Sequence, residues 1–328
     1  MDTRLRSKLG VALIALTALL ATTGLAYAQD SYPIKPVRFI LPLTPGSSTD
    51  ILGRLIANEL SKLWGQSVIV ENRAGAGGNI GADAVAKADP DGYTLLFWNV
   101  GIAIAHSYYR KLPYNALTDL STVSQTTLMP QVVCVNPSLP INTIKDLIEY
   151  AKLKPGQVFF SSAGNGQTDH MAAELFAHMT GIKVTHVPYK GGPQALTAVM
   201  AGEVAFDFPG LPVALPHVKS GKVRAIAVTT AKRSSIAPEI PTIAESGVPG
   251  YDHTFWTGVF APAGTPPPIV AKVGKDIAHV LKHPTVQEVL AKQGVEPVGS
   301  TPAQFSAFFK TEVERFAKLV EATGIKGE

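Results

Sequence analysis

The sequence contains very little cysteine. Cys134 is the only one in 328 residues, and it lies in the apolar run 131–135. A single cysteine forms no intramolecular disulfide bond and supplies no cluster of thiolates for a metal ion. We therefore expect Cys134 to be a buried, inert thiol. The chain is neither a disulfide-stapled domain nor a cysteine-based metal protein.

Charge and long apolar runs are also scarce. Only 16% of the residues are charged, the formal net charge is +4, and the basic residues are scattered along the chain. Nucleic-acid-binding proteins gather basic residues into a patch or stripe, so we expect no nucleic-acid partner. After residue 28, no apolar run approaches the roughly 20 residues of a membrane-spanning helix.

The first 28 residues have the pattern of a cleavable export signal. Three basic residues precede a short apolar segment at 11–21, and Ala26-Tyr27-Ala28 matches the small-x-small cleavage pattern. No cysteine suitable for a lipid anchor follows. The pattern predicts an export signal at residues 1–28 and a mature chain in the periplasm that begins near Gln29.

Strand-like and helix-like segments alternate along the rest of the chain. Apolar runs of strand length, such as 67–72 and 93–98, precede segments with apolar residues at helical spacing. This alternation is typical of α/β folds, in which helices cover parallel sheets. The length suits two domains of about 150 residues each.

One turn organises the N-terminal part of the chain. It follows the first apolar strand and consists of small, hydroxyl-bearing and acidic residues: Thr44, Pro45, Gly46, Ser47, Ser48, Thr49 and Asp50. Apolar residues then recur at helical spacing from Ile51 to Leu63, and Ser48, Thr49 or Asp50 is suited to cap that helix. The N–H groups at a helix N-terminus suit a carboxylate or a phosphate. The alternative is an ordinary strand-to-helix connection.

The same arrangement recurs further along the chain. The strand at 156–161 ends in a loop at 162–168, and the helix that follows carries Met171, Leu175 and Met179 on one face. Ligands of open α/β sheets bind beyond the carboxyl ends of the strands. Two such loops facing each other can hold one small molecule between two helix N-termini. Neither loop contains Arg or Lys, so N–H groups, hydroxyls and water must neutralise an anionic ligand.

Two further features have alternative interpretations. The glycine run at 75–81 follows a strand and precedes a helix, but a dinucleotide-binding G-x-G-x-x-G pattern needs glycine where Ile80 stands. A tight strand-to-helix turn fits better than a dehydrogenase, and no cofactor is expected. Trp98, at the end of a strand beside Asn99, is placed either to stack on an aromatic ligand or to lie in the core.

Several short motifs follow one another in a specific order along the mature chain: Pro45-Gly46-x-x-Thr49-Asp50, Val70-Glu71-Asn72-Arg73, Gly75-Ala76-Gly77-Gly78, Pro90-Asp91-Gly92-Tyr93, Ser162-Ala163-Gly164-Asn165-Gly166, Pro188-Tyr189-Lys190-Gly191 and Trp256-x-Gly258-x-Phe260-Ala261-Pro262. With these motifs the chain resembles, from Tyr32 to its C-terminus, the solute receptors of tripartite tricarboxylate transporters, the Bug-type extracytoplasmic binding proteins.

The resemblance implies a two-domain periplasmic binding protein, a type II-like Venus flytrap with two crossing strands as its hinge. Domain 1 would combine residues 29–130 and 254–328, and domain 2 would comprise residues 131–253. The implied function is to capture a small organic carboxylate between the domains and deliver it to the membrane permease subunits of a tripartite transporter. Catalytic residues, metals and cofactors are not implied, and we expect a monomer.

The resemblance also assigns carboxylate binding to the two loops. The expected ligand-binding residues are Thr44, Pro45, Gly46, Ser47, Ser48, Thr49, Asp50, Trp98, Asn99, Ser162, Gly164, Asn165, Gly166, Thr168 and Asp207. Two positions depart from the family pattern. Ser47 stands where a second glycine is usual, and Ala205 stands where an acidic residue is common, with Asp207 two residues on.

A secreted α/β hydrolase that uses Ser162 and His170 is the alternative function. The members of a catalytic triad usually come from separate loops, whereas Ser162, Asp169 and His170 are close in sequence, and the chain has no G-x-S-x-G elbow. We expect His170 to cap or pack at the start of the second helix, and Asp169 to interact favourably with its dipole. Equilibrium binding without turnover distinguishes a receptor from a hydrolase.

Overall fold

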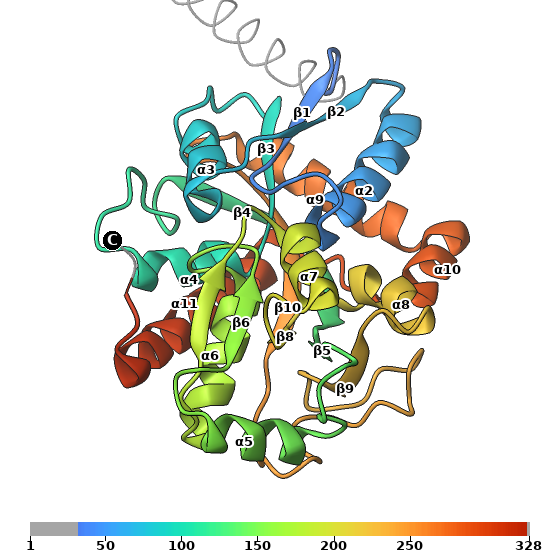
Figure 1. Ribbon diagram of the computed structural model, residues 1–328. Coiled ribbons are helices and arrows are strands. Elements are labelled where there is room, and N and C mark those ends of the chain that lie inside the picture. The colour runs from blue at the N-terminus through green and yellow to red at the C-terminus, as the bar shows by residue number, and fades with distance from the viewer. Residues whose placement is uncertain (1–31, 327–328) are drawn as a thin grey trace, which may run out of the picture.

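The computed structural model describes residues 32–326 and consists of two lobes, each built on its own β-sheet (Figure 1). The expected export signal at residues 1–28 lies outside the described residues. Within 32–326, none of the helices is both long and apolar enough to traverse a bilayer.

The first lobe contains a six-stranded sheet with the strand order β11-β4-β10-β3-β1-β2. Its strands are β1 (Val37–Leu41), β2 (Val68–Asn72), β3 (Thr94–Asn99), β4 (Leu120–Pro130), β10 (Thr254–Pro262) and β11 (Glu296–Pro297). β1 is parallel to β2 and β3, whereas β10 is antiparallel to β3 and β4. The parallel pairs that the alternation favours are present, and the sheet is mixed because the chain leaves this lobe along β4 and returns along β10 in the opposite direction.

Helices cover both faces of this sheet. They are α2 (Ser48–Trp64), α3 (Asn79–Ala86), α4 (Gly101–Tyr108), α9 (Pro267–Leu281), α10 (Pro284–Lys292) and α11 (Pro302–Thr323). Phe39 and Leu41 of β1 pack into one core with α2 and α9, while Ile40 packs into the other core with α3, α4 and α11. A strand buried on both faces has a continuous apolar sequence rather than an alternating one. In the run VRFIL the last three residues, Phe39, Ile40 and Leu41, are accordingly all apolar and buried, whereas Arg38 is partly exposed and pairs with Glu71.

The second lobe contains a five-stranded sheet with the strand order β7-β6-β8-β5-β9. Its strands are β5 (Val132–Val135), β6 (Phe159–Ser162), β7 (Thr185–Pro188), β8 (Phe206–Asp207) and β9 (Arg224–Val228), and its helices are α5 (Ile144–Leu153), α6 (Thr168–Thr180), α7 (Gly192–Ala201) and α8 (Leu211–Lys219). Cys134 lies in β5 as a buried free thiol, and burial raises its pKa. The prediction that the thiol is buried is confirmed.

The chain crosses between the lobes twice, and the two crossings lie side by side. The first joins β4 to β5 through Gln131, and the second joins His253 to β10. Thr229 connects them, because its N–H donates to Gln131 O at 3.0 Å and its carbonyl accepts from His253 N at 2.9 Å. The two connecting segments therefore form one paired unit between the sheets.

Candidate functional site

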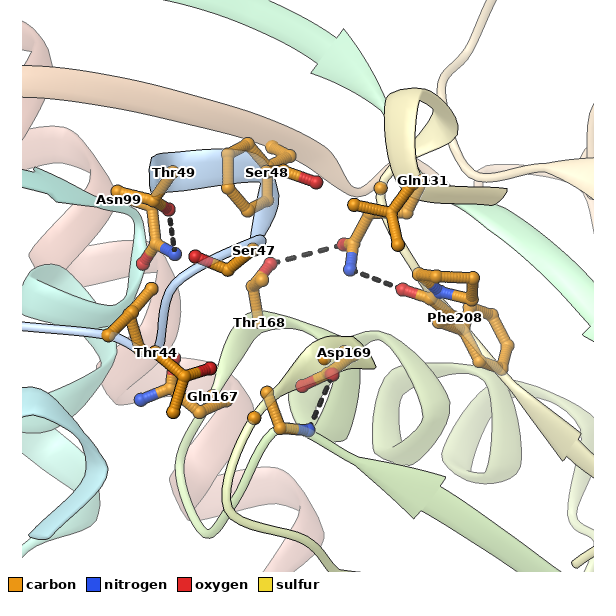
Figure 2. A pocket seen from close by; sticks show the side chains of 18 residues that line it. Thr44, Ser47, Ser48, Thr49, Asn99, Gln131, Gln167, Thr168, Asp169 and Phe208 are labelled. Carbon is orange, nitrogen blue, oxygen red and sulfur yellow. Dashed lines mark hydrogen bonds between the residues drawn. The ribbon is translucent and has the colours of Figure 1, made fainter. Parts of the chain in front are cut away.

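A cavity of about 40 Å³ lies between the lobes, where α2 and α6 begin (Figure 2). Six of the residues expected from the sequence line it: Thr44, Ser47, Ser48, Thr49, Asn99 and Thr168. Figure 2 shows the residues of the first lobe facing Thr168 and Asp169 of the second. The cavity therefore brings together the starts of the two helices that the sequence singles out.

The first side of the cavity is the N-terminus of α2. Ser47, not one of the three residues that follow it, is the N-cap, and its Oγ accepts a hydrogen bond from Asp50 N at 3.2 Å. The sequence placed the cap one to three residues too late. The first N–H groups of a helix have no intrahelical partner. Since Ser47 satisfies that of Asp50, the N–H groups of Ser48 and Thr49 remain available at the cavity.

Asp50 stabilises this loop from within and does not line the cavity. Its carboxylate accepts hydrogen bonds from Gly46 N and Asn72 Nδ2, both at 2.9 Å, and forms an ion pair with Arg54 at 3.0 Å. Burial by itself raises the pKa of Asp50. The hydrogen-bond partners, Arg54 foremost, lower it by more than burial raises it, so the pKa lies below its usual value. Gly46 takes a left-handed φ of 79° in the turn that Asp50 closes. Pro45, Gly46 and Asp50 thus shape the loop behind the cavity rather than its lining.

The second side of the cavity is the N-terminus of α6, where the sequence missed Asp169 as a lining residue. Asp169 is buried, and its carboxylate accepts hydrogen bonds from Ala163 N at 2.7 Å and from His170 N at 2.9 Å. Burial raises the pKa of Asp169 to about 6, although these two N–H groups and the His170 ring act in the opposite direction. Among the residues that line the cavity, Asp169 is the one with an ionisable side chain.

Asp207 lies behind the cavity rather than in it. Its Oδ1 accepts a hydrogen bond from Phe208 N at 2.6 Å, and Phe208 is the residue that reaches the cavity. Burial, and then the charge of Asp169, raise the pKa of Asp207 well above its usual range. The structure therefore corrects the expectation that Asp207 contacts a ligand directly, because the side chain is enclosed within the lobe.

The floor of the cavity comes from the crossing between the lobes. Thr168 Oγ1 donates to Gln131 Oε1 at 3.1 Å, and Gln131 Nε2 donates to Phe208 O at 2.6 Å. Since the Thr168 hydroxyl has one proton, it must accept from His253 Nε2, 3.0 Å away. Burial lowers the pKa of His253 to about 3, so its ring is neutral with the proton on Nε2. The sequence missed Gln131, and no local pattern around it indicates a site.

The other expected residues of the second loop do not line this cavity. Ser162 is buried and its Oγ lies 2.6 Å from His186 Nε2, while Gly164 lines a separate, outer cavity. Asn165 O accepts a hydrogen bond from Tyr109 OH at 2.8 Å. Gly166 N donates to His170 Nδ1 at 3.2 Å, which confirms the expected packing role of His170 at the helix start. These residues hold the loop in shape.

Trp98 is buried in the core of the first lobe and does not line the cavity. Its ring lies against Gly78, where an added Cβ would be 2.9 Å from Trp98 Cε2. Of the two interpretations that the sequence left open, the structure supports the core position. Gly81 likewise allows close packing, since a Cβ there would lie 3.0 Å from Arg73 O. The glycine run is thus the tight strand-to-helix turn that the sequence favoured.

The site does not have the geometry of a hydrolase. Ser162 pairs with His186 rather than with His170, and both Ser162 and His186 lie outside the cavity. Burial, together with the neighbouring His170, lowers the pKa of His186 to about 3, which makes it a weak base. Residues 32–326 also contain no cluster of three or more side chains suited to hold a metal ion.

Comparisons with known proteins identify the family of this chain. Residues 52–325 match the family model described as tripartite tricarboxylate transporter family receptor. The chain belongs to this family. The protein BugT of Bordetella pertussis is 39% identical to this receptor over 99% of the chain and 98% of BugT. Since the family consists of solute receptors, the hydrolase alternative was wrong, and the recognition of a Bug-type receptor is confirmed.

Solved structures share the fold of this receptor. The Rhodopseudomonas palustris protein Rpa4515 with adipate is 38% identical, with a TM-score of 0.87, and the match covers 90% of this chain and 99% of that one. MatC from the same organism, with bound malate, is 31% identical, with a TM-score of 0.84, over 88% of this chain and 100% of MatC. The periplasmic binding protein BugD is 32% identical, with a TM-score of 0.86, over 90% of this chain and 100% of BugD. The two-domain Venus-flytrap fold is thereby confirmed.

Proposed function

We propose that this receptor works in the periplasm, binds one small organic carboxylate in the cavity between α2 and α6, and delivers it to the membrane permease subunits of a tripartite transporter. The observation that carries the proposal is the meeting of two helix N-termini at one cavity that no Arg or Lys lines. Helix N-termini stabilise an anion through their free N–H groups and dipoles. The adipate and malate in related structures support a carboxylate as the anion.

The residues that we propose to contact the ligand come from both lobes. Ser48 and Thr49 offer N–H and hydroxyl groups from the first, and Thr168 and Gln167 complete the cavity from the second. Asn99 donates to Thr49 Oγ1 at 3.0 Å and so fixes the direction of that hydroxyl. The remaining residues of the two loops act indirectly, by holding these groups in place.

We further propose that residues 29–130 and 254–328 move as one domain and residues 131–253 as the other. The paired crossings at 129–133 and 251–256 would serve as the hinge. Contacts between the lobes support a closed form, because Tyr109 OH donates to Asn165 O at 2.8 Å and Gln167 Nε2 donates to Gly77 O. A ligand that both lobes contact binds the closed form better and shifts the population toward it.

Binding is tested by calorimetry and thermal unfolding of the mature chain with a carboxylate library that includes adipate and malate, with sucrose as the uncharged control. We expect saturable binding and a raised Tm, since a ligand at 100 times its Kd adds about 2.7 kcal/mol to stability. The ligand should be recovered chemically unchanged. Ser48→Ala should weaken binding, while Ser306→Ala, a helical serine outside the cavity, should not. No binding by any carboxylate would refute the proposal.

Closure and the oligomeric state are tested together by small-angle scattering. We propose a monomer whose radius of gyration falls when a saturating carboxylate is added. A radius that stays constant while calorimetry confirms tight binding would argue against the hinge. A mass of twice the chain would argue against the monomer.

A further inference from the structure

A second cavity between the lobes, here called the rear cavity, has a volume of about 440 Å³. The first lobe lines it with residues 128–130 of β4, Thr254, Ala291 and residues 294–297 around β11, and the second lobe lines it with residues 230–235 and Asp252. Among the described residues, none lines both the rear cavity and the cavity between α2 and α6. Because each lobe supplies one wall, the width of the rear cavity depends on the angle between the lobes.

The strand order of the first sheet places the crossings between the two cavities. β4 and β10, which lead into the crossings, are neighbours, with β3 and β1 on one side of the pair and β11 on the other. Asn99 at the end of β3 and Thr44 after β1 line the cavity between α2 and α6. Glu296 and Pro297 of β11 line the rear cavity. The two cavities therefore lie on opposite sides of the hinge.

This arrangement couples the widths of the two cavities. When two bodies turn about a hinge, they approach each other on one side of it as they separate on the other. Opening the cavity between α2 and α6 therefore moves residues 230–235 toward β11 and compresses the rear cavity. At one point on this side the lobes are already in contact, because a Cβ on Gly294 would lie 2.9 Å from Ile236 Cδ1.

The side chains at the rear cavity leave space for a larger group. Ala231 lines it from the second lobe and Ala291 lines it from α10 of the first, and both are exposed. Arg233 does not fill it, because its guanidinium pairs with Glu245 at 2.8 Å and donates to Pro238 O at 2.9 Å. An engineered cavity of about 150 Å³ holds a benzene ring, so the rear cavity has room for an aromatic side chain.

We propose that the rear cavity sets the balance between the open and closed receptor. With small side chains on its walls, it leaves the lobes free to open, whereas a group that fills it resists compression and so favours the closed form. Since the apparent Kd equals the intrinsic Kd divided by the closed fraction, filling the rear cavity strengthens carboxylate binding without touching the ligand. This inference rests on the hinge of the proposed function.

The test is Ala291→Phe, which adds a ring to one wall of the rear cavity. Small-angle scattering of the ligand-free chain should give a smaller radius of gyration than for the native chain. Calorimetry should give lower Kd values for adipate and malate, both by the same factor. That factor is about ten if the closed form rises from roughly a tenth of the population to most of it. Ala291→Leu, a smaller addition, should act in the same direction but less.

Two further variants complete the test. Gln287→Phe adds the same ring at an exposed position of α10 outside the rear cavity, and it should change neither the radius nor the Kd values. Ala231→Phe fills the cavity from the opposite wall and should act like Ala291→Phe, which keeps the proposal testable if one variant does not fold.

A ligand-free radius that stays constant or grows in the folded variants, or an equal effect of Gln287→Phe, would overturn the proposal. If neither acid binds any variant, that counts against the proposed function, while the scattering of the ligand-free chains still decides about the rear cavity.

Discussion

The lobes approach closely at Gly210, and this gives a direct test of closure. Gly210 is at the start of α8 in the second lobe, with φ −62° and ψ 141°, a conformation open to any residue. An added Cβ would lie within contact distance of Ser48 Oγ and 3.2 Å from Ser48 Cβ, on the opposite lobe. Gly210→Ala should therefore disturb the closed form far more than the separate lobes.

The expected cost follows from the geometry. The Ser48 hydroxyl is free to rotate away from the new methyl group, but Cβ–Cβ contacts of 3.2 Å are tighter than usual, so the lobes must separate slightly. Overpacking by one methyl group costs about 1–3 kcal/mol. Because the Ser48 hydroxyl can move, we expect Gly210→Ala to destabilise the closed form by about 1–2 kcal/mol. This corresponds to a roughly 5- to 30-fold higher Kd for the ligand.

A double-mutant cycle with Ser48→Gly isolates the contact between the lobes. Gly210→Ala should weaken binding much less in the Ser48→Gly background, where the Cβ that it meets is gone. Gly192→Ala is the control, since a Cβ there has no atom within 4 Å. Urea unfolding of the ligand-free chain measures the separate cost of alanine at the α8 cap, at most about 1 kcal/mol. An equal loss of affinity in both backgrounds would refute the reasoning.

Three other predictions concern single side chains. Ser47→Ala removes the α2 cap and should lower the free energy of unfolding by about 1 kcal/mol in urea, whereas Ser47→Gly should cost only a few tenths. Carboxylate affinity, measured by calorimetry from pH 5 to 8, should fall as the pH rises through about 6, because ionised Asp169 repels the anion. Asp169→Asn should make the affinity nearly independent of pH over this range. If the variant keeps the pH dependence of the native chain, Asp169 is not its cause. Trp98→Leu should cost about 2–4 kcal/mol of stability, measured in urea, and should weaken aromatic and aliphatic carboxylates equally.

Much of the fold was predictable from local patterns. The VRFIL run, the hydroxyl-rich turn and the periodic segment after it identified β1, the loop and α2, because each depends on nearby residues. The antiparallel position of β10 between β3 and β4 was not predictable in this way. Strand neighbours depend on long-range packing, which apolar periodicity does not encode.

Site residues at the starts of helices could be predicted from the sequence, whereas site residues positioned by tertiary contacts could not. Ser48, Thr49 and Thr168 follow from the two loops. Gln131 reaches the cavity only because the crossing segment passes beneath it, and a lone glutamine carries no sequence signal. Asp50 is a polar residue at the start of a helix, which is why the sequence indicated it as a ligand-binding residue. Its carboxylate instead binds Arg54 and Asn72, which both lie outside the loop at 44–50, and so points away from the cavity.

The position of β10 has a consequence for how the chain acquires its structure. All five strands of the second lobe come from one continuous stretch, whereas β10, near the centre of the first sheet, is made only after that whole stretch. The first lobe therefore closes its sheet across a very long loop, and pairings distant in sequence form slowly. The second lobe should therefore become protected first, and pulse-labelled hydrogen exchange during refolding should show β6 amides protected before those of β10. Until β10 inserts, β3 and β4 have exposed edges open to chaperones or to other chains.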